Sequence, residues 1–420
     1  MAHQAHNIPW TLLSSNLKWA PAGSCNCGAT NLRPRLRPNQ GKELTYFANA
    51  FAKNIAEHSA CERRKYPEKY DEPSATDVIL DEDIVKKIIP TVRRWRSERE
   101  SDYCCGGNAC RPHEDGECQC PALPYEERRV SAFFRARVMN DCYKFFEVNK
   151  AGFFNLELVK TLILHGEMDP ILRASAHPRV SLKDWWHDGE CMCMDPDLGW
   201  DQLCEKALAA YMCLNVTYCF PEMWDVASGK TEETDYRHTK FYQHTLMMCT
   251  EVGITSDVVM YPHQQFFGAI NHRLASVDEN HRCGKFPFDK FLALMGSTEH
   301  QPNLSDVCLV RWMLCRKGLP VELSIEIMRF AEYVPKGTLK VPHDPFHPSN
   351  SEELALYLKY CWQILVRCDM MAKALDMKIP WQNLITKCII ELWGSKDCCL
   401  RKWYEWLGSG EYDTTRYEFL

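Results

Sequence analysis

Apolar residues recur every three or four positions along residues 351–375, and this spacing constrains the fold more than any other feature of the sequence. It is the period of one face of an α-helix. The apolar positions are Leu354, Leu358, Cys361, Leu365, Cys368, Met371 and Leu375. Asn350 and Glu353 have the spacing of a capping box at the start of a helix. The pattern therefore predicts a long helix over Ser351–Leu375.

The same period predicts helices along much of the chain. A helix opened by Pro320 precedes the long one, and a helix over Pro380–Trp393 follows it. Further predicted helices cover Lys42–Arg64, Asp81–Ser97 with an end or kink at Pro90, much of Tyr125–Leu164, Asp201–Leu214, Tyr236–Val252 and Leu304–Lys317. Strands do not alternate with helices along the sequence. We expect a mainly α fold, an irregular multi-helix globular protein with long loops and little sheet.

The patterns also divide the 420 residues into regions. Residues 1–41 hold prolines and a run of arginines without helical spacing, which predicts a poorly ordered tail. Residues 42–317 follow as a helical region with a cysteine-rich loop at 101–125 and a tryptophan-rich middle. We expect a compact helical carboxy-terminal region at residues 318–394 and a charged, aromatic tail at residues 395–420.

Charge and hydropathy exclude some classes of function. A phosphate-binding surface needs a basic excess, whereas the net charge is −6, so the sequence carries no strong nucleic-acid signal. No stretch reaches the ~18 consecutive apolar residues that suggest a membrane span. The beginning of the chain also lacks the charged and then apolar pattern of a secretory signal. Of the three possible macromolecular partners, nucleic acid, membrane and protein, the sequence therefore favours a protein.

Cysteine is unusually frequent. The chain contains 23 cysteines, an odd number in a long sequence without a secretory signal. This usage favours a reducing compartment, the cytoplasm or the nucleus, in which most cysteines are small buried hydrophobic residues. We therefore expect an intracellular protein.

The predicted cysteine-rich loop contains six candidate zinc ligands. They are Cys104, Cys105, Cys110, His113, Cys118 and Cys120. Zinc takes four thiolate or imidazole ligands, which closely spaced cysteines and a histidine can supply. The spacing lacks the two-residue gap of a zinc knuckle, so a flexible insert of reduced thiols and a disulfide pair remain alternatives. His187 with Cys191 and Cys193, and Cys25 with Cys27, are two further candidate half-sites.

No catalytic signature occurs in the sequence. It contains neither the G-x-S-x-G and H-E-x-x-H motifs nor the glycine-rich motifs that bind phosphate or dinucleotides. An enzyme would therefore use a site of unrecognised type. The tryptophan-rich middle, with Trp185, Trp186, Trp200 and Trp224, is the candidate location.

One short segment carries a docking motif. Leu-Pro-Val-Glu-Leu at residues 319–323, followed by Ile327, resembles the first helix of an F-box. In that family the helix docks on the adaptor of a cullin ubiquitin ligase, so the resemblance implies an adaptor role for residues 319–333. The apolar stripe of this helix is instead expected to pack against the long helix over residues 354–375. The stripe consists of Leu323, Ile327, Phe330 and Ala331.

A broader resemblance covers residues 318–394. It consists of Pro-His-Asp-Pro-Phe-His-Pro at 342–348, Tyr-Leu-x2-Cys-Trp-x2-Leu-Val-Arg-x-Asp-Met at 357–370, and an apolar helix that ends in Trp393. These residues are similar to the carboxy-terminal region of a family of uncharacterised filamentous-fungal proteins. Some such proteins accompany secondary-metabolite gene clusters, which implies an accessory role in biosynthesis.

Three functions stay open from the sequence. The favoured hypothesis is a helical interaction or accessory protein without classical catalysis. The second is an enzyme with an unrecognised site in the tryptophan-rich middle, and the third is an F-box-like ubiquitin-ligase adaptor. The catalytic residues and any cofactor other than zinc are not identified by the sequence.

Overall fold

The computed structural model describes residues 7–19, 32–35, 40–97, 123–138, 145–186, 199–225, 235–250, 304–331 and 343–393, with shorter runs between 263 and 302 and between 333 and 341. Helices dominate these residues, which confirms the predicted mainly α fold. Sheet in the described ranges is limited to one antiparallel pair, β1 (Leu17–Trp19) and β2 (Leu32–Pro34). No helix that the structure describes combines the length and the apolar character needed to cross a membrane.

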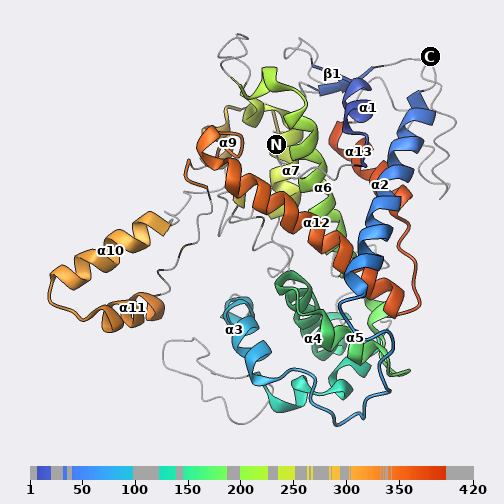
Figure 1. The fold of residues 1–420 in the computed structure, drawn as a ribbon, viewed down its shortest axis with the longest axis vertical. Coiled ribbons are helices and arrows are strands. Elements are labelled where there is room, and N and C mark those ends of the chain that lie inside the picture. Colours follow the sequence, from blue (N-terminus) through green and yellow to red (C-terminus); the bar gives the residue numbers. More distant parts are fainter. Residues whose placement is uncertain are drawn as a thin grey trace.

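Four helices that are far apart in the sequence form the main body, which we call the bundle (Figure 1). They are α2 (Gln40–Arg63), α6 (Asp201–Tyr218), α12 (Ser351–Ala374) and α13 (Trp381–Trp393). Both α12 and α13 pack against α2 and α6, and α7 (Lys240–Thr250) adds to the side of α6. Because each helix turns an apolar face toward the others, the centre of the bundle excludes water.

Aromatic side chains fill one end of the bundle. Trp362 on α12 stacks on Phe51 of α2, with ring centroids 5.7 Å apart and planes 8° from parallel. Its indole N–H donates to His58 Nδ1 at 2.7 Å, so the polar atom of this buried ring is satisfied. Trp10, on α1 (Trp10–Ser15), packs edge-on against Phe51. Within the predicted amino-terminal tail, the structure thus contains a short helix that contacts α2 and α6.

A second group of helices lies beside the lower end of α12 (Figure 1). It comprises α3 (Glu82–Ser97), α4 (Phe145–His165) and α5 (Met168–Ser175). Arg367 of α12 donates to the carbonyl of Ile163 at 2.8 Å and thereby satisfies an acceptor in the last turn of α4. Gly166 follows with a φ of +80° directly against the Arg367 guanidinium, where a Cβ atom would lie 2.9 Å from a nitrogen. Arg367 therefore links α12 to this second group.

Two further helices, α10 (Leu304–Arg316) and α11 (Val321–Phe330), project from one side as a hairpin (Figure 1). The remaining described elements are short. They are α9 (Phe288–Ala293) and the 3-10 turns Tyr125–Arg128, Val130–Phe134, Leu182–Trp185, Pro221–Met223, Tyr236–His238 and Pro348–Asn350. The helices predicted by long periodic patterns agree closely with α2, α6, α10, α12 and α13, whereas the division of the chain into regions stays a prediction.

Two local predictions were wrong, and a third is narrowed. Residues 125–134 form 3-10 turns rather than an α-helix, because the backbone around Arg129 pairs with Val78 and Arg128 O accepts from the N–H of Ile79 at 2.9 Å. Helix α3 continues through Pro90, so of the two predicted outcomes, an end or a kink at this proline, the end is excluded. No side-chain cap begins α12, because the amide of Asn350 bonds instead to the backbone of Val341, at 2.9 and 2.8 Å.

Candidate functional sites

The predicted zinc ligands lie outside the residues that the structure describes. They are Cys104, Cys105, Cys110, His113, Cys118 and Cys120, and the two candidate half-sites at residues 25–27 and 187–193 are likewise outside. In the described part of the chain, no three His, Cys, Asp or Glu side chains come together as metal ligands. Zinc binding by the cysteine-rich loop therefore stays a prediction.

Most of the cysteines that the structure describes are buried free thiols. Burial raises the pKa of Cys213 on α6 and of Cys361 on α12 to about 12. Both thiols are therefore protonated at neutral pH, and a protonated, enclosed thiol is neither a nucleophile nor a metal ligand. These cysteines act as small hydrophobic residues, in agreement with the expectation from their number.

The tryptophans of the middle region serve packing where the structure describes them. The indole N–H groups of Trp185, Trp200 and Trp224 donate to the backbone carbonyls of Arg135, Leu182 and Thr217, at 2.8, 2.9 and 3.1 Å. The N–H is the only hydrogen-bonding group of an indole, so these rings have no polar group left for a substrate. The candidate catalytic region thus consists, at these three positions, of structural side chains.

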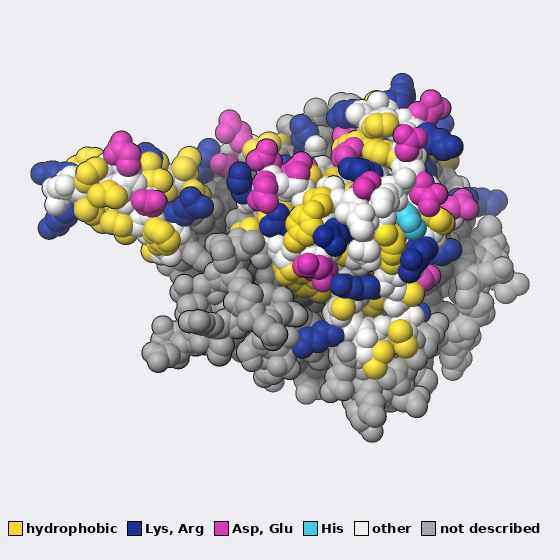
Figure 2. Space-filling model, turned by 90° about the horizontal axis from the view of Figure 1, so that it is seen from below, with side chains coloured by type: hydrophobic (Ala, Val, Ile, Leu, Met, Phe, Trp, Pro, Cys, Tyr) yellow, Lys and Arg dark blue, Asp and Glu magenta, His cyan; other side chains and the backbone are white. Residues whose placement is uncertain are grey.

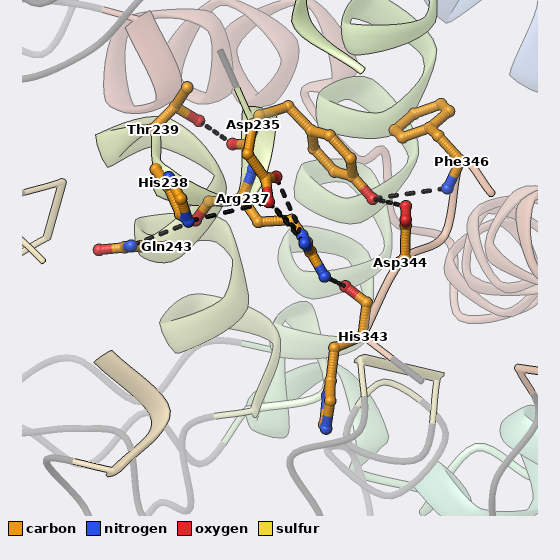
Figure 3. A network of polar contacts seen from close by, with 9 residues as sticks. Asp235, Arg237, His238, Thr239, Gln243, His343, Asp344 and Phe346 are labelled. Atoms are coloured by element: carbon orange, nitrogen blue, oxygen red, sulfur yellow. Dashed lines mark hydrogen bonds and ion pairs between the residues drawn. The ribbon is translucent and has the colours of Figure 1, made fainter. Parts of the chain in front are cut away.

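A polar network joins the start of α7 to the loop before α12 (Figure 3). Asp235 and Arg237 form a two-pronged ion pair, with Nε–Oδ2 and Nη2–Oδ2 distances of 2.8 and 2.5 Å. Arg237 Nη1 reaches across to the backbone carbonyl of His343 at 3.4 Å. Gln243 connects the same segment to the backbone at Phe286, because it donates to the carbonyls of Arg237 and Phe286, at 3.1 and 3.0 Å. The network therefore fixes the position of the loop at His343.

The hydroxyl of Tyr236 provides the other half of this connection (Figure 3). It donates to Asp344 Oδ1 at 3.2 Å and accepts from the N–H of Phe346 at 3.4 Å. Asn350 closes the loop from its far end by donating to Asp344 O at 2.6 Å. From His343 on, the described part of the run that carried the fungal resemblance is thus a loop held at its middle and at its end, and its polar groups stabilise the fold.

His343 is the member of the network with the most potential for chemistry. Its φ of +60° is a left-handed conformation, which histidine adopts more readily than most residues other than glycine. Its Nδ1 lies 3.3 Å from Phe267 O and must donate to it, which leaves Nε2 as an acceptor. Burial lowers the pKa of His343, so the ring is neutral at neutral pH. A neutral half-buried imidazole is a suitable general base.

His263, unlike the half-buried His343, is fully buried, and it lies inside the protein against α12. Its Nδ1 contacts the hydroxyl of Tyr357, and Tyr357 stacks on Phe266 with ring centroids 3.7 Å apart. Burial, with a smaller contribution from the charge of Lys206, lowers the pKa of His263 to about 3. His263 therefore stays neutral over the physiological range and serves as a packed hydrogen-bonding group. No sequence pattern had indicated either His263 or the network around Arg237.

The α10–α11 hairpin has the opposite character, because its large side chains face solvent. Nine large hydrophobic residues are exposed on it, and we call them the hairpin apolar residues (Figure 2). They are Leu304, Leu309, Trp312, Met313, Val321, Leu323, Ile325, Ile327 and Phe330. Only five other large hydrophobic residues are exposed in the rest of the described chain. Apolar surface is therefore concentrated at this one place.

The hairpin has a defined turn. Gly318 has a φ of +94° and follows the last turn of α10. The N–H of Leu319 donates to Leu314 O at 3.3 Å and the N–H of Gly318 to Cys315 O at 3.0 Å, which is the bonding pattern of a Schellman motif. Ser324 and Met328 form the buried side of α11, where it packs on α10. The turn therefore sets two helices side by side with their apolar flanks open.

The predicted packing of the α11 stripe against α12 was wrong. Leu323 is 48% exposed and Phe330 is 84% exposed, and the helix packs on α10 instead. The apolar spacing was correctly recognised, but burial also requires a facing element, and α12 uses its own apolar face against α2 and α6. The helix with the docking motif is thus accessible.

Together these features define a mainly helical protein in which the described exposed large hydrophobic residues are gathered mostly on one hairpin. Residues 11–404 match the family described as Gramillins biosynthetic cluster protein GRA5, and the chain belongs to this family. The match extends the predicted resemblance from residues 318–394 to almost the whole chain and confirms the association with a fungal biosynthetic gene cluster. The family description does not refer to an F-box.

Comparisons with curated proteins and with solved structures found no match.

Proposed function

We propose that the chain is an accessory protein of its biosynthetic cluster and that it acts by protein association through the α10–α11 hairpin. One observation carries this proposal: nine of the fourteen large hydrophobic side chains exposed in the described chain lie on these two helices. Large exposed apolar patches are rare unless they bind another surface, since each exposed aliphatic side chain leaves ~1.5–3 kcal/mol of burial energy unused.

The test is complementation in a fungal strain that contains such a cluster and lacks this gene. We expect the unchanged chain to restore the product of the cluster. The variant Leu323→Ser/Ile327→Ser/Phe330→Ser should restore less than about a tenth of it, because truncated interface anchors commonly cost ~2 kcal/mol or more. Immunoblotting checks that the variant accumulates normally.

A matched control separates the hairpin from apolar surface in general. Tyr46 on α2 and Leu356 on α12 are also well exposed, at 63% and 66%. The variant Tyr46→Ser/Leu356→Ser should restore product fully. If the hairpin variant restores as much product as this control and the unchanged chain, the hairpin is not the functional surface and the proposal is overturned.

An enzyme is the second candidate, and His343 is the observation that favours it. It combines a neutral imidazole with a left-handed backbone conformation and a fixed position beside Arg237. Such backbone conformations occur more often at active sites than elsewhere. If His343→Gln abolishes product formation while the hairpin variant retains it, catalysis at this loop replaces protein association as the function.

The F-box-like adaptor is the third candidate. The exposure of Leu323 and Ile327 leaves the helix free to dock, which the sequence had not led us to expect. Purified full-length chain should be tested for binding to the cullin adaptor at tens of micromolar. Absence of binding at that concentration removes the adaptor hypothesis and leaves the other two.

Compartment and metal binding are separate proposals. The buried free thiols support a reducing compartment, the cytoplasm or the nucleus, and imaging of a fluorescent fusion in the fungus tests this. Zinc in the cysteine-rich loop is tested by metal analysis of protein purified under reducing conditions. Near-stoichiometric zinc that is lost in a Cys104→Ser/Cys105→Ser variant is the expected result, and absence of zinc excludes the site.

A further inference from the structure

The apolar side chains of the hairpin cover more of each helix than one neighbour can bury. On α11 the seam against α10 contains Ser324 and Met328. At about 100° per residue, Val321 and Ile325 lie on one flank of that seam, and Leu323, Ile327 and Phe330 lie on the other. The apolar arc of α11 therefore spans roughly 200°, about twice the stripe of a helix that packs on one surface.

A four-helix bundle is the arrangement that covers such an arc, because each helix then contacts two neighbours. Helix α10 shows a second open stripe, in which Leu309 and Met313 are four residues apart and both exposed. The hairpin supplies two antiparallel helices, so another pair of the same kind would complete a bundle. The hairpin also extends away from the main body, where a second molecule can reach it (Figures 1 and 2).

The charges of the hairpin favour a second copy of the same chain over an unrelated partner. Helix α10 and the turn after it carry the exposed cations Arg311, Arg316 and Lys317, whereas α11 carries the exposed anions Glu322 and Glu326 and one exposed cation, Arg329. In the described residues Arg311, Lys317, Glu322 and Glu326 have no ion-pair partner. Two-fold interfaces are self-complementary, so α10 of one copy would lie beside α11 of the other and unlike charges would meet on both sides.

We propose that two copies of this chain associate through their α10–α11 hairpins to form an intermolecular four-helix bundle. This inference rests on the proposed role of the hairpin in protein association and names the partner. It makes the protein a homodimer whose main bodies stand at the same end of the shared bundle, because the antiparallel match of α10 with α11 of the other copy sets the two hairpin turns side by side. The hydrophobic residues supply the affinity, and the charge pairs set the antiparallel match of α10 with α11.

The first experiment measures the mass of the full-length chain by light scattering after size-exclusion chromatography at micromolar concentration. We expect twice the 48.8 kDa of one chain, and we expect the variant Leu323→Ser/Ile327→Ser/Phe330→Ser to elute as a monomer with an unchanged helical circular dichroism spectrum. The control Tyr46→Ser/Leu356→Ser should remain dimeric. A monomeric unchanged chain across the micromolar range would overturn the inference.

Charge reversal tests the pairing itself. Glu322→Lys/Glu326→Lys makes both helices basic, and Arg311→Glu/Lys317→Glu makes both acidic, so each variant alone should dimerise roughly tenfold more weakly. When the two variants are mixed, unlike charges meet again and a heterodimer should form with nearly the original affinity. If mixing does not restore association, α10 does not pair with α11 of a second copy.

The two proposals fail in distinguishable ways. A monomeric chain whose hairpin variant still loses product formation disproves self-association but retains a hairpin that binds another protein. A dimeric chain whose monomeric hairpin variant restores product fully supports self-association and disproves the functional role of the hairpin.

Discussion

The bundle and the hairpin are built from helices with similar apolar spacing, yet the bundle buries its apolar residues whereas the hairpin exposes them. Leu358 and Leu365 on α12 are fully buried, whereas Leu323 and Phe330 on α11 are 48% and 84% exposed. The difference lies in the neighbours: α12 meets α2 and α6 from distant parts of the chain, and α11 meets the adjacent α10. An amphipathic pattern therefore shows which residues need a partner without showing whether the same chain provides it.

The largest expected difference between the two regions is the cost of removing a leucine. Leu358→Ala should lower the free energy of unfolding by about 3 kcal/mol, because it leaves a cavity at the centre of the bundle. Leu323→Ala, the same change on the hairpin, should cost less than about 0.5 kcal/mol. Guanidinium denaturation at concentrations low enough to keep the chain monomeric measures both. Similar losses would show that the hairpin is part of the cooperative core.

Acid should destabilise the bundle through His263. Below about pH 6.5 the unfolded chain binds a proton at this histidine, whereas the folded chain stays neutral until its pKa of about 3. The contribution of His263 to the free energy of unfolding is therefore fully present above pH 6.5, and it falls by ~1.4 kcal/mol per pH unit as the pH is lowered toward 3. His263→Gln should remove this part of the pH dependence in denaturation curves between pH 7 and 4.5.

A second variant shows whether burial or the hydrogen bond causes the acid sensitivity. Tyr357→Phe deletes the hydroxyl that contacts His263 and leaves the ring enclosed. Because burial is the main cause of the lowered pKa of His263, Tyr357→Phe should keep the slope that His263→Gln loses. An unchanged slope in His263→Gln would assign the acid response to other groups, such as His165 or His343.

Asp369 should matter less than the apolar core, though it joins two helices of the bundle. It accepts from the Trp381 indole N–H at 2.8 Å and pairs with Lys373 Nζ at 2.6 Å. Asp369→Ala leaves the buried indole N–H without an acceptor and should cost about 2 kcal/mol of unfolding free energy. Asp369→Asn keeps an acceptor and should cost less than half as much by the same measurement. Equal costs would show that the ion pair dominates.

The smallest effect should be confined to the hairpin. Gly318→Ala places a β-carbon on a residue with a φ of +94°, which costs about 1 kcal/mol, although nothing lies within 4 Å of that carbon. Amide hydrogen exchange in the last turn of α10 should become about fivefold faster, while exchange in α12 stays unchanged. Asparagine tolerates this conformation better than alanine. In Gly318→Asn the exchange rate of the last turn of α10 should therefore lie between the rates of the unchanged chain and of Gly318→Ala. Faster exchange in α12 would show that the hairpin and the bundle are coupled.

Much of the helical framework could be predicted because the signals are local. The spacing of Leu354, Leu358 and Leu365 predicted α12 to within one residue of its observed end. At residues 125–134 the helical spacing was misleading, since pairing of Arg129 with Val78 makes an extended backbone more favourable there. The predicted capping role of Asn350 was wrong for a related reason, because the side-chain amide of Asn350 is hydrogen-bonded to the backbone of Val341 instead.

The candidate sites were less predictable than the helices. Neither His263 nor the network of Asp235 and Arg237 belongs to a motif, and each depends on residues about a hundred positions away in the sequence. The docking helix was found from its Leu-Pro-x-Glu-Leu pattern, but the expected packing of Leu323 on α12 was wrong. Pairing across such distances is set by the arrangement of helices, on which a local pattern carries no information.

The sequence by itself determined that this chain is helical and where its long helices run, because helix formation depends on residues three and four apart. Only the tertiary structure decided which apolar faces are covered. Leu358 is buried and Leu323 is exposed, although both belong to apolar stripes of the same period. Burial depends on what lies opposite a side chain, and for α10 and α11 the described chain provides only one helix for each.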